Sequence, residues 1–307
     1  MDQTCDISVI TINYNGLEDT CALIGSIPLA DNVEVIVVDN ASKEDEATVI
    51  EQRYPHVKVV RSSDNLGFAG GNNLGIKAAS GCYLFFINND TEFPPGEWEH
   101  VEDLVRRMGA DNKVGVVCPK IRFFWDDRPI QFAGYTPLSR ITMRNRSIGF
   151  GEADHGQYDS PHLTPYAHGA AMLVSREAVE KAGLMPECFF LYYEELDWSM
   201  MFRRAGFDIW YDPACTIYHK ESRSTGQGSP LRTYYITRNR LLFARRNLSA
   251  PVRWLTYCYL VGIVAMRDVL MHTFRRKPAI RRATLKGIAD FVKGRSGRSC
   301  SLPERKG

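Results

Sequence analysis

The strongest constraint on the fold is an alternation of short β-branched runs with segments of helical spacing between residues 7 and 87. The apolar runs span residues 7–14, 33–38, 57–60 and 83–87. The run at 33–38 is almost continuously apolar, which is typical of a strand that is covered on both faces. Strands and helices in this order predict an α/β fold with a doubly wound, mainly parallel sheet.

Polar stretches follow these runs at the places where each strand would end. They comprise residues 13–15, 39–40, 64–73 and 88–90. In a doubly wound sheet, ligands bind beyond the carboxyl ends of the strands. We therefore expect ligand-binding residues among these four stretches.

Asp39 ends the most hydrophobic of the runs. A carboxylate at this place is suited to accept a hydrogen bond from the imide N–H of a uracil or thymine ring. Alternatively, Asp39 forms a turn or caps a helix, since Ser42 and the acids at 44–45 follow it.

The stretch 64–73 contains Gly70 and Asn72, is rich in glycine and side-chain amides, and opens a helix. Glycine lets a backbone approach a ligand closely, and a helix N-terminus favours phosphate. The stretch matches neither the GxGxxG fingerprint nor a P-loop. A purely structural turn is therefore the alternative.

Residues 88–91 follow an apolar run and include Asp90. A carboxylate at a strand end is well placed to hold Mg²⁺ or Mn²⁺ against a diphosphate, because hard cations prefer oxygen ligands. Because Asn88 and Asn89 carry amides, we expect this cluster to bind a divalent cation less tightly than paired aspartates would. An Asx turn is the alternative.

Residues 192–198 open an amphipathic helix that carries three acids, Glu194, Glu195 and Asp197, among aromatic residues that include Trp198. Aromatic walls bind sugar rings, and partial desolvation raises the pKa of a carboxylate toward general-base use. Alternatively, the acids only offset the dipole of the helix.

Three further candidates lie downstream. His219 ends a strand-like run and is either a ligand or a structural residue. Arg238 and Asn239 lie on a helix predicted at 231–247. Arg238 and Arg240, which flank Asn239, either bind a diphosphate or belong to a solvated face.

Taken together and in order, these motifs resemble glycosyltransferase family 2, particularly its rhamnosyltransferase-like branch. The resemblance covers roughly residues 7–247. It rests on the segments 8–15, 37–42, 65–73, 86–91, 169–173, 189–198 and 218–219. It implies a GT-A fold in a catalytic domain at 1–247 and an inverting, metal-assisted transfer of a sugar.

The resemblance and the strand-end stretches together assign roles to residues. Glu195 would be the general base, although the family usually has Asp at this position. Asp90 and His219 would hold Mg²⁺ or Mn²⁺. The acceptor side would comprise Glu194, Asp197, Trp198 and His168. The donor-binding residues would be Asn13, Tyr14, Asn15, Asp39, Gly70, Asn72, Asn89, Arg238 and Asn239.

The implied reaction moves L-rhamnose from dTDP-L-rhamnose onto a lipid-linked or polysaccharide acceptor in cell-envelope synthesis. A UDP-sugar donor carrying galactofuranose or N-acetylglucosamine is the first alternative. A sugar nucleotidyltransferase would show a glycine-rich, basic loop after the first strand, where this chain has the residues at 13–16. A non-catalytic carbohydrate-binding protein would not need Asp39, Asp90 and Glu195 together. No nucleic-acid partner is expected.

Residues 248–307 predict a helical, basic region that associates with a membrane. The apolar run at 254–266 is short of the ~20 residues that a spanning helix needs, and its aromatic residues favour the bilayer interface. The basic segment 275–298 fits a helix on an anionic leaflet. The alternative is a core helix followed by a solvated tail. Because the 8 cysteines stand singly and no leader opens the chain, we expect a cytoplasmic protein, peripheral on the inner face of the membrane.

Overall fold

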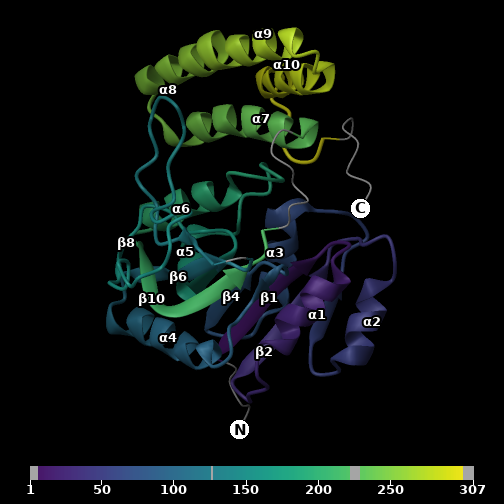
Figure 1. Cartoon of the computed structure of the whole chain (residues 1–307), viewed down its shortest axis with the longest axis vertical. Coiled ribbons are helices and arrows are strands. Elements are labelled where there is room, and N and C mark those ends of the chain that lie inside the picture. The colour runs from purple at the N-terminus through teal and green to yellow at the C-terminus, as the bar shows by residue number, and fades with distance from the viewer. Residues whose placement is uncertain (1–5, 126, 222–228, 300–307) are drawn as a thin grey trace.

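The computed structural model describes residues 6–125, 127–221 and 229–299. These residues form a 10-stranded sheet that is flanked by helices (Figure 1). The first half of the sheet is parallel, with the strand order β3-β2-β1-β4. This half confirms the strands that the sequence predicts between residues 7 and 87. Its strands are β1 (Ile7–Asn13), β2 (Val33–Asp39), β3 (Lys58–Arg61) and β4 (Tyr83–Ile87).

The second half of the sheet makes the whole sheet mixed. β9 (Ala171–Ser175) lies antiparallel between β4 and β6 (Val114–Phe123), and β10 (Asp208–His219) runs parallel to β6. β9 follows a long irregular segment rather than a crossover helix, so nothing forces it into a parallel orientation. Short antiparallel strands complete the sheet: β5 (Thr91–Glu92), β7 (Ile130–Phe132) and β8 (His162–Leu163).

Helices connect and cover the strands. α1 (Leu17–Gly25), α2 (Glu46–Arg53) and α3 (Gly67–Ala78) alternate with the parallel strands, as expected. The central part adds η1 (Glu97–His100), α4 (Val101–Ala110), α5 (Arg176–Ala182) and α6 (Glu194–Arg204). The largest core cluster is built from both faces of the sheet and the helix sides that pack on them.

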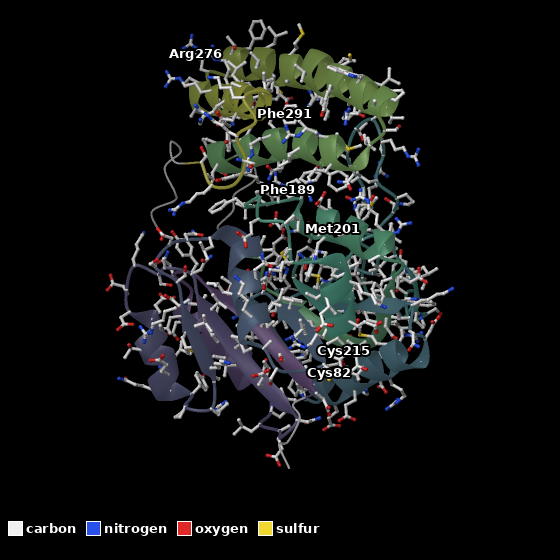
Figure 2. The ribbon with its side chains drawn as sticks, turned by 180° about the vertical axis from the view of Figure 1, so that it is seen from behind. Cys82, Phe189, Met201, Cys215, Arg276 and Phe291 are labelled. Atoms are coloured by element: carbon white, nitrogen blue, oxygen red, sulfur yellow. The ribbon has the colours of Figure 1, made fainter. Side chains whose placement is uncertain are left out.

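The C-terminal helices form a separate layer beyond the sheet (Figure 1). α7 (Pro230–Asn247) lies next to the sheet domain, and α10 (Pro278–Val292) packs along α7. A Cβ at Gly287 would lie 2.9 Å from the carbonyl oxygen of Tyr234, so a glycine permits this close approach. Phe291 of α10 packs against Tyr257, with ring centroids 5.4 Å apart (Figure 2).

The outermost element is one continuous helix at 250–274, which comprises α8 (Ala250–Tyr257), the π-helical segment η3 (Cys258–Ala265) and α9 (Met266–Phe274). It has 25 residues and extends beyond the apolar run at 254–266 at both ends, and its length and composition suffice to cross a membrane. Only 17% of its most apolar window is buried. Residues 300–307 of the predicted membrane-associating region lie outside the described residues.

Candidate functional site

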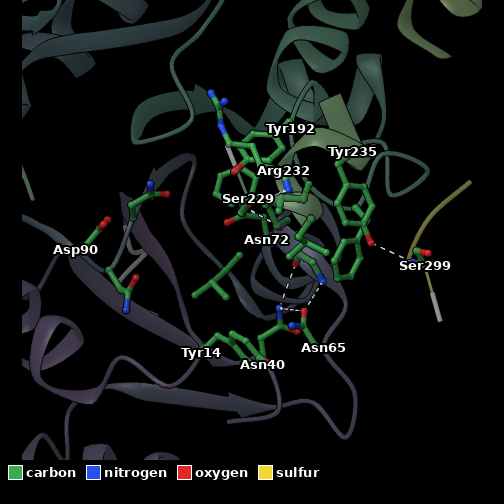
Figure 3. A pocket seen from close by; sticks show the side chains of 18 of the residues that line it. Tyr14, Asn40, Asn65, Asn72, Asp90, Tyr192, Ser229, Arg232, Tyr235 and Ser299 are labelled. Atoms are coloured by element: carbon green, nitrogen blue, oxygen red, sulfur yellow. Dashed lines mark hydrogen bonds between the residues drawn. The ribbon is translucent and has the colours of Figure 1, made fainter. Parts of the chain in front are cut away.

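A cavity of about 640 Å³ lies at the carboxyl ends of β1 and β4, under the N-terminal end of α7 (Figure 3). We call it the strand-end cavity. It lies where the doubly wound topology predicts a ligand site. Residues of the predicted polar stretches form one wall: Tyr14, Asn40, Asn65, Asn72, Asn88, Asn89 and Asp90. The opposite wall includes Phe190, Tyr192, Ser229, Arg232, Tyr235 and Ser299.

Asp39, a predicted donor-binding residue, does not line this cavity and belongs to a buried polar network. Its Oδ1 accepts a hydrogen bond from Asn13 Nδ2 at 3.0 Å, and Asn13 also donates to Glu46 Oε2 at 2.7 Å. Asn13 is fully buried, so it orients carboxylates rather than contacting a ligand itself. The N-cap of α2 is Asp45, whose side chain accepts from the backbone N–H of Thr48. Asp39 is therefore not the helix cap.

The turn after β1 places Tyr14 at the cavity. Asn15 follows it with a φ of 53°, a left-handed conformation that Asn tolerates better than most residues. The Asn15 side chain accepts from the backbone N–H of Lys43 at 2.9 Å. Asn15 thus shapes the turn, and Tyr14 is the residue of this stretch that lines the cavity.

The glycine-rich stretch contributes Asn72 to the cavity but not Gly70. A Cβ at Gly70 would lie 2.6 Å from the Leu66 Cβ, so Gly70 serves packing. The glycine that the backbone requires is Gly67, whose φ is +73° and whose Cβ would collide with the carbonyl of Phe190. Asn72 lines the cavity and donates to the carbonyl of Phe68 at 3.1 Å.

Asn40 is a cavity residue that the sequence analysis did not single out. Its Oδ1 accepts from the backbone N–H of Leu66 at 2.9 Å, and its Nδ2 donates to the Gly67 carbonyl at 3.2 Å. It therefore fixes the start of α3 against the end of β2. The signal was present, since Asn40 follows Asp39 directly at a predicted strand end. In the same wall, Asn89 donates to Thr20 Oγ1 at 3.0 Å.

Asp90 and His219 come together as predicted, with 3.1 Å between Asp90 Oδ1 and His219 Nε2. The His219 Nδ1 lies 2.8 Å from Gln131 Oε1, which it donates to as an N–H. The Nε2 lone pair then points at a carboxylate oxygen, and two acceptors at this distance require a proton or a cation between them. The arrangement fits a divalent cation.

The remaining ligands of such a cation would be oxygens from outside the protein. Among the described residues, no group of three or more His, Cys, Asp or Glu side chains gathers at one point. Two protein ligands with the rest from phosphate and water is a usual arrangement for Mg²⁺. Asp90 also lines the strand-end cavity, so a diphosphate there would reach the same cation.

His168 lies near this pair and stacks on Tyr135, with ring centroids 5.8 Å apart. Its Nδ1 accepts from the backbone N–H of Ala170. Burial, together with the nearby His219, lowers the pKa of His168 to about 3. His168 is therefore a neutral side chain at physiological pH.

Glu194 and Glu195 occupy the first turn of α6, and they differ in environment. Glu194 is buried and its Oε2 has no hydrogen-bond partner among the described residues. Burial raises the pKa of both carboxyls, and the charge of Glu195 raises the pKa of Glu194 further. Burial therefore disfavours the charged form of both carboxyls, and more strongly for Glu194, which also faces the charge of Glu195.

Glu195 does not itself line the strand-end cavity. It is partly exposed, unlike Glu194. A Cβ at Gly169 would lie 3.7 Å from both the Glu195 Cγ and the ring of Phe68, and Phe68 lines the cavity. Glu195 is therefore the more exposed carboxyl of the pair, and it lies near one residue of the cavity lining.

Residues 189–193, which we call the aromatic loop, lead into α6 in an unusual conformation. Phe190, Tyr192 and Tyr193 have φ values of 68°, 68° and 80°. Left-handed backbone costs a non-glycine residue about 1–2 kcal/mol, so the surrounding structure must hold this loop in place.

Arg238 and Asn239 hold the aromatic loop, and this corrects their predicted role at the donor diphosphate. Asn239 Nδ2 donates to the carbonyls of Phe189, Leu191 and Tyr192 at 3.0, 2.8 and 2.8 Å. Arg238 Nη2 donates to the carbonyl of Phe189 at 2.8 Å. Both side chains are almost completely buried, and neither lines the cavity. Figure 2 shows Phe189 directly beneath α7.

Asp197 and Trp198 are also structural, which corrects their predicted place on the acceptor side. Both are fully buried. Asp197 pairs with Arg246 at 2.8 Å and so ties α6 to α7. Trp198 packs edge-on against Phe86 and donates its Nε1–H to the carbonyl of Gly183 at 2.9 Å.

The wall contributed by the C-terminal layer has no counterpart in the sequence analysis. Arg232 lies over the ring of Tyr192, with 5.7 Å from its Cζ to the ring centroid. Tyr235 stacks on Phe190, and its hydroxyl accepts from the backbone N–H of Ser299 at 3.0 Å (Figure 3). No local pattern marks these residues, because only the packing of α7 on the aromatic loop brings them to the cavity.

Known proteins resemble this chain over most of its length. The low-salt glycan biosynthesis hexosyltransferase Agl10 of Haloferax volcanii is 26% identical over an alignment of 319 positions, which covers 99% of this chain and 98% of the relative. The N-acetylglucosaminyl-diphospho-decaprenol L-rhamnosyltransferase of Mycobacterium tuberculosis is 26% identical over an alignment of 298 positions, which covers 86% of this chain and 92% of the relative.

Solved structures share the fold. The mannosyltransferase PcManGT from Pyrobaculum calidifontis, in complex with GDP-Man and Mn²⁺, superimposes with a TM-score of 0.56 at 15% identity, covering 93% of this chain and 86% of that one. GalNAc-T7 with UDP, GalNAc and Mn²⁺ gives 0.57 at 14% identity, covering 89% of this chain and 58% of that one. Both are GT-A glycosyltransferases, so the predicted GT-A fold is confirmed.

The family itself follows from the sequence match. The model for "Glycosyl transferase family 2" matches residues 8–183, which include nearly all of β1, the strands β2 to β9 and Asp90. This confirms the family that the order of motifs predicted. The chain belongs to glycosyl transferase family 2 and is a glycosyltransferase of the GT-A fold.

Proposed function

We propose that the protein is an inverting glycosyltransferase that moves L-rhamnose from dTDP-L-rhamnose onto a lipid-linked or polysaccharide acceptor in cell-envelope glycan synthesis. One observation carries the proposal: Asp90, which is paired with His219, lies in one wall of the strand-end cavity, and Glu195 lies near Phe68, a residue of the cavity lining. The choice of sugar is supported by the mycobacterial relative, which is named as an L-rhamnosyltransferase acting on a diphospho-decaprenol acceptor.

The donor would lie in the strand-end cavity. Asp39, held by Asn13, would accept from the imide N–H of the base, and Tyr14 would lie against the base or ribose. The amides of Asn72 and Asn89 face the rest of the donor. Asp90 and His219 would hold Mg²⁺ or Mn²⁺, and this cation, when bound, would neutralise charge on the departing diphosphate.

The chemical step would be one in-line displacement. An acceptor hydroxyl oxygen attacks the anomeric carbon and forms the new glycosidic bond, while the bond to the diphosphate oxygen breaks. Glu195 takes the hydroxyl proton, and the nucleoside diphosphate leaves with the bonding electron pair. A single displacement inverts the configuration at the anomeric carbon.

A UDP-sugar donor, carrying galactofuranose or N-acetylglucosamine, is the second candidate. Uracil and thymine present the same imide N–H, so Asp39 would serve either base. The nucleotide of the donor is identified by the binding of dTDP and UDP to the wild-type protein. Release of a nucleoside diphosphate on transfer, measured with each purified donor, tests the proposal.

The donor-site residues predict two separable effects on binding. Asp39→Ala removes a charged acceptor, so we expect the affinity for free dTDP to fall about 10–100-fold even without metal. Asp90→Asn should abolish only the additional affinity that Mg²⁺ confers. Isothermal titration calorimetry with and without Mg²⁺ measures both effects. Asp64→Ala, at an exposed acid of the glycine-rich stretch, is the matched control. Wild-type affinity in both Asp39→Ala and Asp90→Asn would refute the donor site.

We further propose that the helix at 250–274 lies on the anionic inner face of the cell membrane. α7 precedes this helix and α10 follows it, and these two helices pack on each other. Both ends of the helix are therefore on the same side, which fits an interfacial helix rather than a spanning one. Its exposed apolar side chains include Trp254 at 64% and Phe274 at 84% exposure. Basic residues at 275–277 follow directly, and each contributes about 1 kcal/mol near an anionic surface.

Membrane binding is tested by removing apolar side chains from the outer face only. The double substitution Trp254→Ser and Phe274→Ser should greatly reduce co-sedimentation with anionic liposomes at low salt. Leu29→Ser, at an apolar residue that is 74% exposed and lies in the sheet domain, should leave it unchanged. A wild-type protein that stays in the supernatant with anionic liposomes would disprove the membrane proposal, and the glycosyltransferase assignment would stand.

A further inference from the structure

A second cavity, of about 370 Å³, lies between α7, the helix at 250–274 and α10. We call it the α7 cavity. Its polar side carries three arginines, Arg144, Arg232 and Arg240. Arg232 also lines the strand-end cavity, so the two cavities adjoin at this side chain.

The three arginines converge because of the helix period and a hairpin-like loop. Arg232 and Arg240 are eight residues apart on α7, so they lie on one face of the helix. Arg144 comes from the segment that folds back where the backbone N–H of Ser139 donates to the Arg144 carbonyl. The segment brings a third guanidinium to the same cavity.

Arg232 and Arg240 have ring and hydroxyl partners rather than acidic ones in the part of the chain that the structure describes. Arg240 Nε donates to the hydroxyl of Tyr193 at 3.0 Å, and Arg232 lies over the ring of Tyr192. Among the described residues, no carboxylate forms an ion pair with any of the three arginines. The acid in the cavity lining, Asp268, pairs instead with Arg267 at 2.7 Å. Guanidinium groups gathered in this way are suited to bind a diphosphate.

The other side of the α7 cavity is apolar and opens toward the outer helix. Leu260, Val261 and Val264 of η3 line it, and Ile288 of α10 faces them. The π-helical turn of η3 widens the helix at this point, and such turns often occur at functional sites. Ile263 and Met266 continue the apolar surface outward, at 60% and 59% exposure. A ligand in this cavity thus meets positive charge at one end and an apolar path at the other.

We propose that the α7 cavity binds the diphosphate of a lipid-linked acceptor, with its isoprenoid chain leaving along Leu260, Val261 and Val264 toward the bilayer. The proposal deepens the proposed function and rests on it. The aromatic loop joins this site to the base, because Tyr193, which receives the Arg240 hydrogen bond, lies two residues before Glu195. A sugar attached to the diphosphate would extend from the arginines toward Glu195 and the donor.

Equilibrium binding of geranylgeranyl diphosphate to the full-length protein, in one detergent, tests the proposal. We expect Arg144→Gln and Arg240→Gln each to weaken binding about 10-fold or more, which corresponds to the loss of a charge-assisted hydrogen bond. Arg146→Gln is the matched control, because Arg146 is exposed on the same segment and outside the cavity. Val264→Asp should also abolish binding.

Two further probes distinguish the source of the binding energy. Inorganic pyrophosphate should bind far more weakly than geranylgeranyl diphosphate, and geranylgeraniol should not compete. Equal affinity for pyrophosphate would overturn the lipid part of the proposal, and equal affinity for geranylgeraniol would overturn the diphosphate part. Wild-type affinity in both arginine variants would overturn the site as a whole.

The proposed function is checked separately in the same variants. Arg144→Gln and Arg240→Gln should keep the wild-type affinity for dTDP, since neither residue lines the strand-end cavity. If wild-type protein binds neither dTDP nor UDP, the proposed function fails whatever the lipid probe does. If nucleotide binding is normal and the lipid diphosphate does not bind, only the acceptor site fails.

Discussion

Glu195→Gln is expected to lower the rate of sugar transfer by about 10²–10⁴-fold, the contribution of a general base, and to leave donor affinity unchanged. The amide keeps the size of the side chain but cannot accept the hydroxyl proton. Steady-state transfer assays give kcat, and calorimetry with dTDP gives the donor affinity.

Glu194→Gln is the matched control for this experiment. Its pKa is raised by burial and by the charge of Glu195, so Glu194 is protonated and an amide replaces it with little electrostatic change. We expect near-normal turnover. A dead Glu194→Gln together with an active Glu195→Gln would show that the base was assigned to the wrong carboxyl.

The pH dependence of the rate supplies a second measurement on the same residue. A base acts in its deprotonated form, so activity is lost as the pH falls through the pKa of Glu195. Burial raises this pKa above the usual 4.5. The acid limb of kcat is therefore expected above pH 4.5 in the wild type and should be absent from the residual activity of Glu195→Gln.

The sequence predicted part of this cavity wall, because a parallel strand order brings the ends of its strands to one edge of the sheet. Tyr14, Asn72, Asn89 and Asp90 line the cavity, whereas Asn13, Asn15, Asp39 and Gly70 do not. Asp90 and His219 come together because β5 pairs with β10. The prediction of this pair depended on the order of the family motifs, because no local spacing of residues indicates it.

The acids of α6 show a limit of predicting functional residues from helical periodicity. Trp198 and Phe202 are four residues apart and therefore share one face of α6. The structure buries this face in the core. Periodicity states which residues share a face, but it does not say whether that face meets a ligand or the sheet. Asp197 is buried for a tertiary reason, since its partner Arg246 lies on another helix.

The C-terminal layer was the least predictable part of the site. Ser299 and Arg232 reach the strand-end cavity only because α10 packs along α7 and the chain then returns to Tyr235. Arg238 and Asn239 were recognised as a motif, but their bonds are to backbone carbonyls 47 to 50 residues away in the sequence. Such contacts cannot be predicted from the spacing of residues in the sequence.

The second large effect is expected from Asn239, whose side chain holds the aromatic loop. Asn239→Ala leaves the carbonyls of Phe189, Leu191 and Tyr192 without this donor, and a buried unsatisfied group costs about 1–3 kcal/mol. The left-handed residues of the loop then lose three of the hydrogen bonds that hold them. We expect a lower Tm and at least a 10-fold lower kcat, because Glu195 lies two residues after the end of the loop.

The pH dependence of kcat shows whether Asn239 positions Glu195 or only stabilises the fold. If the loop relaxes, water reaches Glu195, its pKa falls toward 4.5, and the limb moves to lower pH. Asn247→Ala is the matched control: this residue is on the same helix and donates to Asp197 and to the Phe243 carbonyl, but not to the loop. It should lower the Tm without moving the limb. An Asn239→Ala protein that is less stable but has wild-type kcat and an unmoved limb would mean that Asn239 only supports the fold. The loop would then hold Glu195 in place without it.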